Sequence, residues 1–70
     1  MAMQSVKSSN LAKVGYDAKH AVLKVQFTSG ARYIYYDVPE SVYRNLLNAE
    51  SLGSYFYYNI RTSYRYEKVS

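Results

Sequence analysis

Two stretches in the first half of the chain alternate between hydrophobic and polar residues. In residues 21–28 (AVLKVQFT) the hydrophobic positions share one face and the polar positions the other: Leu23, Val25 and Phe27 against Lys24 and Gln26. Residues 10–17 (NLAKVGYD) alternate more loosely. A period of two is typical of strands that bury one face. Both stretches therefore predict strands, joined by a polar turn at residues 17–20 (DAKH).

A third strand is predicted over residues 31–38 (ARYIYYDV), after the Ser-Gly pair at 29–30. The three strands would form an antiparallel meander. The register of the second hairpin decides where Tyr33 and Tyr35 point, because a shift of one residue sends every side chain to the opposite face.

Two turn geometries are compatible with this hairpin. A two-residue primed turn at Ser29 and Gly30 would expose Tyr33 and Tyr35 beside Lys24 and Gln26, but it requires a positive φ at Ser29. In a bulged turn, Gly30 supplies the left-handed position, so that Val25 faces Tyr33 and Leu23 faces Tyr35. We favour the bulged turn, which directs these tyrosines mainly to the core.

Two short helices are predicted after the strands. Residues 37–50 (DVPESVYRNLLNAE) combine Pro39 and Glu40 at the start of a helix with one apolar stripe. The stripe consists of Val42, Tyr43, Leu46 and Leu47. Ser51 can cap a second helix, whose apolar residues recur every four positions at Leu52, Phe56 and Ile60, with Tyr55 beside them.

These elements predict an α+β domain: a three-stranded antiparallel sheet followed by two short helices and an ordered C-terminal tail. Residues 1–9 are polar, small and aperiodic, so we expect a flexible N-terminal arm. Residues 10–70 would form the single domain, since 70 residues leave no room for a second core.

Composition adds expectations about the surroundings and the partner. There is no Cys, no run of about 20 apolar residues and no apolar leader in MAMQSVKSSN. We therefore expect a cytoplasmic protein that does not associate with membranes. The net charge of +4 favours anionic partners, and it also suits plain solubility.

The sequence offers little for catalysis, metal binding or a cofactor. It contains one histidine, His20, in the polar turn three residues after Asp17, and we expect it to be a solvated residue that satisfies the turn. The five carboxylates are scattered, and the three glycines are too far apart to form a phosphate loop. The prediction is a protein that is not an enzyme, with no metal and no cofactor.

The ten tyrosines are the remaining chemical signal. Those expected mostly at the core are Tyr16, Tyr33, Tyr35, Tyr43 and Tyr55, because a phenol can bury its ring while its hydroxyl reaches water. Tyr57 and Tyr58 fall off the apolar stripe of the second helix. Tyr57 also precedes Arg61 by one helical turn, so the two side chains could stack with no ligand present.

Exposed rings interleaved with cations are typical of surfaces that hold single-stranded nucleic acid without reading its sequence. The candidate nucleic-acid-binding residues are Tyr57, Tyr58, Arg61, Tyr64, Arg65, Tyr66 and Lys68. An alternative is that Tyr64 and Tyr66 pack back on the sheet as a short closing strand. Two other functions also remain possible interpretations. One is a homo-oligomeric or protein-interaction module that uses Tyr57, Tyr58 and Ile34 or Tyr36. The other is a nucleotide-sequestering protein.

The order of these signals resembles the KTSC domain family, named for its occurrence at the C-terminus of some lysyl-tRNA synthetases. The resemblance runs from about Ser9 to Val69 and rests on VGYD at 14–17, L-x-V-x-F at 23–27, Gly30, YIY at 33–35, VP at 38–39, VY at 42–43, Ser51, Gly53, Phe56, Ile60, Arg61, Tyr64 and Tyr66. Tyr57 stands where the family pattern has Asn, so no role of that Asn is carried over. The resemblance implies an α+β domain that also occurs as a stand-alone protein, and RNA binding proposed from its attachment to a synthetase.

Overall fold

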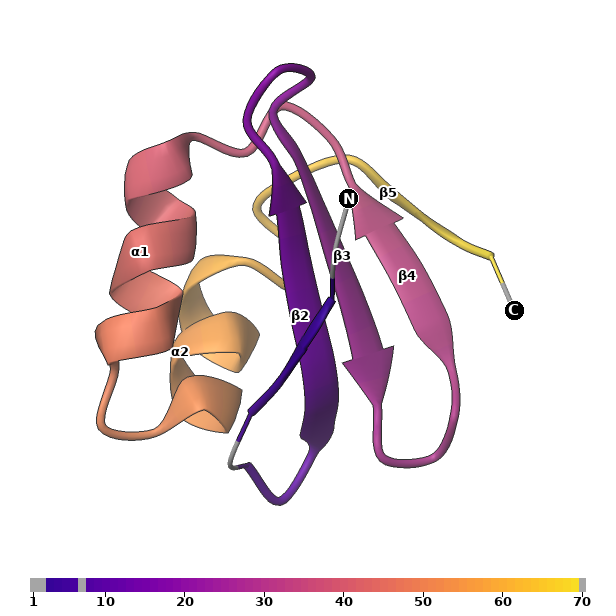
Figure 1. Cartoon of the computed structure of the whole chain (residues 1–70), viewed down its shortest axis with the longest axis vertical. Coiled ribbons are helices and arrows are strands. Elements are labelled where there is room, and N and C mark those ends of the chain that lie inside the picture. Colours follow the sequence, from indigo (N-terminus) through magenta and orange to yellow (C-terminus); the bar gives the residue numbers. More distant parts are fainter. Residues whose placement is uncertain (1–2, 7, 70) are drawn as a thin grey trace.

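Five antiparallel strands and two helices make up the fold in the computed structural model, which describes residues 3–6 and 8–69 (Figure 1). The elements are β1 (Gln4–Ser5), β2 (Leu11–Asp17), β3 (Val22–Phe27), β4 (Arg32–Tyr35), α1 (Glu40–Asn48), α2 (Leu52–Asn59) and β5 (Tyr66–Lys68). The strands are hydrogen-bonded in sequence order from β1 to β5. The predicted α+β class is therefore confirmed, and the predicted meander corresponds to β2, β3 and β4.

The sheet has two strands more than the three predicted, one at each edge. Residues 4 and 5, inside the expected flexible arm, pair with β2, and β5 pairs with β4. Met1, Ala2 and Lys7 of that arm lie outside the described residues. Both added strands are too short to show a periodic pattern, because β1 has two residues and β5 has three. Their pairing depends on the edges that the meander offers.

The favoured register of the β3–β4 hairpin is confirmed. Val25 lies opposite Tyr33 and Leu23 opposite Tyr35. Gly30 has a φ of 97°, a left-handed conformation in which a side chain would be strained, and its N–H donates to the Phe27 carbonyl at 2.9 Å. Tyr35 is consequently buried, with 2% of its surface exposed.

Each helix begins at the signal expected from the sequence. Pro39 precedes the first residue of α1, and its carbonyl accepts the Val42 N–H at 3.0 Å. The Ser51 hydroxyl accepts the Ser54 N–H at 3.2 Å, which caps α2. Both helices lie on the same side of the sheet in Figure 1. The core between the two layers consists of Leu11, Val14, Leu23, Val25, Tyr35, Val38, Leu46, Phe56 and Ile60.

Candidate functional site

A groove of about 530 Å³ lies between α2 and the helix-facing side of the sheet. Its walls come from segments that are distant in the sequence: the β3–β4 turn, β4, α2 with the residues that follow it, and β5. The groove is larger than a second hollow of about 200 Å³, which is lined in part by Lys24, Arg32 and Ile34.

Aromatic rings form the floor of the groove. Phe27 meets Phe56 edge to face, with ring centroids 5.6 Å apart, and meets Tyr33 in the same way at 5.5 Å. Tyr35 contacts Phe56 edge to face at 5.5 Å and stacks on Tyr66 at 5.1 Å. Offset-stacked and edge-to-face pairs of this kind are favourable contacts between rings, so the floor is a continuous packed surface.

Two exposed tyrosines from different elements line the groove. Tyr57 of α2 is 55% exposed and Tyr66 of β5 is 48% exposed, and both line it. The Arg61 guanidinium lies over the Tyr57 ring, 4.9 Å from its centroid, which confirms the pair expected from their spacing. Tyr58, 78% exposed, meets Tyr57 edge to face at 5.2 Å. The rim therefore carries accessible ring faces beside a cation.

The charge of the groove is positive. Arg61 is the charged residue among the described residues that line it, and none of those residues is a carboxylate. Lys68 lies opposite Tyr33 in the β4–β5 register, so its side chain starts from the same face of the sheet. An anionic group that enters the groove therefore meets the Arg61 guanidinium and no carboxylate among the lining residues.

The other candidate residues of the tail lie elsewhere. Because side chains alternate along a strand, Arg65 and Glu67 project to the face opposite Tyr66. There the Arg65 guanidinium lies 4.7 Å from the centroid of the Tyr36 ring. Tyr64 is half-buried against the core. The candidate set is thus divided. Tyr57, Arg61 and Tyr66 line the groove, while Tyr58 contacts Tyr57 and Lys68 starts from the same face of the sheet. Arg65 lies on the outer face of the sheet.

On that outer face, Tyr36 links the two charged residues of β5. Its hydroxyl donates to the Glu67 carboxylate, and this hydrogen bond, followed by partial burial and the charge of Glu67, raises the pKa of Tyr36. Arg65 and Glu67 therefore lie on either side of one phenol.

Tyr35 anchors the backbone at the rim. Its hydroxyl donates to the Arg61 carbonyl at 3.3 Å, which ties the turn after α2 to the sheet. Burial is the main reason why its pKa is raised from 10.0 to about 12, with smaller contributions from Tyr66 and Tyr33. The phenol stays protonated and can donate at neutral pH, so it helps to hold Arg61 in place.

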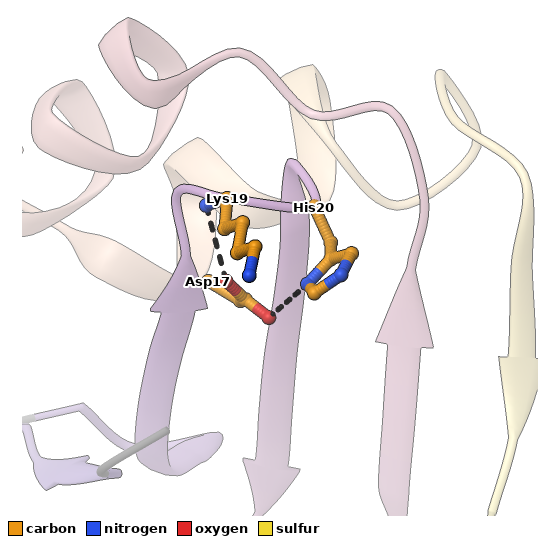
Figure 2. A network of polar contacts seen from close by, with 3 residues as sticks. All are labelled: Asp17, Lys19 and His20. Carbon is orange, nitrogen blue, oxygen red and sulfur yellow. Dashed lines mark hydrogen bonds and ion pairs between the residues drawn. The ribbon is translucent and has the colours of Figure 1, made fainter.

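His20 has the turn-satisfying role expected from the sequence. Figure 2 shows its ring against the Asp17 carboxylate, with Nδ1 2.7 Å from Oδ2, while the other oxygen accepts the Lys19 N–H at 3.1 Å. The hydrogen bond from His20 is the largest cause of the lowered pKa of Asp17. Over the described ranges, no three His, Cys, Asp or Glu residues are grouped as a metal site requires.

Sequence reasoning assigned Tyr33 to the core and did not consider Phe27 or the turn at 28–31 as parts of a site. The structure places all of them at the groove. The one signal that could have pointed to them is the bulged register, because it puts Tyr33 opposite Val25, on the side of the sheet that faces the helices. None of the helices among the described residues has the length and apolar character of a membrane span.

Comparisons with known proteins agree with this architecture. The family model of the KTSC domain matches residues 7–67. The crystal structure of a KTSC domain protein from Yersinia pestis superposes with a TM-score of 0.95 at 32% identity, covering 99% of this chain and 97% of that one. An uncharacterized protein from Stutzerimonas stutzeri is 41% identical over 66 residues, which are 93% of each chain.

The same segment is found within a much larger protein. A lysine–tRNA ligase from Nostoc punctiforme is 34% identical over 64 residues, which are 91% of this chain and 11% of the ligase. The domain is thus found both as a small stand-alone protein and as part of synthetases. The agreement over nearly the whole chain confirms the resemblance seen in the sequence, and this chain belongs to the KTSC domain family.

Proposed function

We propose that this KTSC domain binds RNA, or another anionic nucleic acid, without catalysing a reaction, and that the groove holds its bases. The observation that carries the proposal is the pairing of exposed ring faces with positive charge. Tyr57 and Tyr66 flank an aromatic floor, Arg61 lies at the rim, and the described lining residues include no carboxylate. Bases stack on such rings, and their phosphates meet the cations.

Charge limits the strength of the interaction. Arg61 and Lys68 are on the side of the groove, and Arg65 is not. Counterion release from two phosphate contacts gives a dependence on salt with a log-log slope of roughly one to two, and a correspondingly weak affinity for the monomer. The similarity to a segment of a lysine–tRNA ligase, an enzyme whose substrate is an RNA, supports RNA as the polymer.

The test is a fluorescence anisotropy titration with single-stranded RNA, duplex RNA and transfer RNA at two salt concentrations. Tyr57→Ala should weaken binding of single-stranded RNA by roughly 5- to 150-fold, which corresponds to one lost base stack. Arg61→Ala should reduce the salt slope by about one.

Arg44→Ala is the matched control for the loss of one arginine. Arg44 is exposed on α1, where it pairs with Glu40 at 3.0 Å, and it does not line the groove. Arg44→Ala should leave the affinity for RNA nearly unchanged. Flat curves with every RNA, or an equal loss for Arg44→Ala and Arg61→Ala, would refute the proposal.

The volume of the groove supports a second candidate function, the binding of a free nucleotide. A space of about 530 Å³ lies within the range of small-molecule sites, and it would accept one base with its phosphate near Arg61. A thermal-shift screen with mononucleotides and cyclic nucleotides distinguishes the two. Stabilisation by mononucleotides without binding of any RNA would favour sequestration of nucleotides.

A further inference from the structure

The outer edge of β5 presents hydrogen-bonding groups with no partner in the described chain. The sheet ends at β5, and Figure 1 shows no element beyond it. The Arg65 carbonyl accepts the Tyr36 N–H at 2.8 Å, and the Val69 N–H donates to the Arg32 carbonyl at 2.9 Å. Because backbone groups alternate in direction along a strand, those of Tyr66 and Lys68 point away from β4.

Such an edge is a template for another strand, and exposed edges are usually protected by charge or by a covering segment. Here the three residues of β5 are all exposed, Glu67 and Lys68 among them are charged, and Val69 follows the strand. Tyr66 and Val69 are each 48% exposed. The edge is therefore suited to strand addition, and the side chains decide which strand it accepts.

The sequence around Tyr66 is complementary to itself. In an antiparallel pair of two copies centred on Tyr66, the two Tyr66 residues exchange their outward N–H and C=O groups. Arg65 of each copy then lies directly opposite Glu67 of the other, at a position without hydrogen bonds, where facing side chains approach most closely. Both charge pairs lie on the outer face, and the two Tyr66 rings lie side by side on the helix face.

Neighbouring registers lack this complementarity. A pair centred on Glu67 places two carboxylates opposite each other, and one centred on Lys68 places two ammonium groups opposite each other. Like charges that face one another across strands are unfavourable. Among the registers that use the outward groups of β5, the Tyr66-centred one matches opposite charges.

We propose that β5 is a homodimerisation edge, at which two copies pair antiparallel about Tyr66 to form one continuous ten-stranded sheet. The interface is isologous, because the same strand serves both copies. Two short strands bury little surface, so the dimer is weak and forms at high protein concentration. The proposal does not depend on RNA binding, since it rests on the backbone edge and on the Arg65 and Glu67 side chains.

Charge reversal gives a direct test by sedimentation equilibrium over a range of protein concentrations. Arg65→Glu and Glu67→Arg each place like charges opposite one another twice per dimer, and each should raise the dimer dissociation constant about 10-fold or more. The double variant Arg65→Glu with Glu67→Arg restores opposite charges at both positions and should recover most of the wild-type association. Lys19→Glu, in the β2–β3 turn, makes the same charge change as Arg65→Glu away from β5 and should leave association unchanged.

Amide hydrogen exchange of the wild type provides a second readout that needs no variant. At low protein concentration the Tyr66 amide should exchange faster than the Glu67 amide, which faces β4, and exchange of the Tyr66 amide should slow as the concentration rises. A monomer at all concentrations, or a dimer that neither single reversal weakens, would overturn the proposal. Recovery in the double variant together with concentration-dependent protection of Tyr66 supports it.

Discussion

The buried hydroxyl of Tyr35 links the stability of this domain to alkaline pH. Its pKa is about 12 in the folded chain, against an ordinary value of 10.0, chiefly because the ring is buried. The folded state therefore holds the proton more tightly than the unfolded chain does. The resulting stabilisation is fully present below about pH 10 and is lost as the pH rises through about 12.

The size of the effect follows from the shift. Each pKa unit corresponds to about 1.4 kcal/mol, so the full contribution is roughly 2–3 kcal/mol, and about half of it is lost by about pH 11. Tyr35→Phe removes this titration together with the hydrogen bond to the Arg61 carbonyl, which contributes about 1 kcal/mol at neutral pH. The wild type should thus be about 1 kcal/mol more stable than the variant at pH 8, and the difference should vanish near pH 11.

Urea unfolding followed by far-UV circular dichroism between pH 8 and pH 11 measures this convergence. Tyr16 and Tyr36 also have raised pKa values, but both remain in the variant, so their effects cancel in the difference. Tyr58→Phe removes a phenol whose ring is 78% exposed and should give a curve parallel to the wild type. If the Tyr35→Phe curve also stays parallel to that of the wild type, the reasoning from burial is wrong.

Further predictions concern four single substitutions. In Gly30→Ala the added Cβ has no atom within 4 Å, so backbone strain alone should lower the unfolding free energy, by roughly 1–2 kcal/mol in chemical denaturation. Gly53→Ala, in α2, should instead raise the unfolding free energy by about 0.5–1 kcal/mol. Ser51→Ala removes the cap of α2 and should lower the unfolding free energy by about 1 kcal/mol. Asp17→Asn should reduce the loss of stability on acidification. The lowered pKa of Asp17 stabilises the fold above pH 3.8, and this contribution disappears as the pH falls. Unchanged acid sensitivity of the variant would contradict a folded-state role for the pair of Asp17 with His20.

Most of the fold follows from local signals in the sequence. Alternation in residues 21–28 locates β3, and the requirement for a left-handed residue at Gly30 selects the register that buries Tyr35. The cap at Ser51 locates α2. These features could be predicted because each depends on residues that are close in the sequence.

The edges of the sheet and the shape of the groove depend on contacts between distant segments. Gln4–Ser5 has no pattern of its own, and it pairs because β2 offers an open edge. The Tyr57–Arg61 pair was predictable from its spacing of four residues. The separation of Arg65 from that pair could not be predicted, because it follows from the alternation of side chains along β5. A strand was only one of the two interpretations of the tail.

The order in which the chain returns to its sheet has a consequence for how the groove opens. The strands β1 to β4 are neighbours in both sequence and space, but β5 joins β4 only after the chain has passed through both helices. Closing that long loop is entropically more demanding than closing a hairpin, so the β5 pairing should form late in folding and detach first in native-state fluctuations. Tyr66 belongs to this strand and lines the groove. Detachment of the three residues of β5 from β4 would therefore widen the groove while the hairpins and the core stay intact.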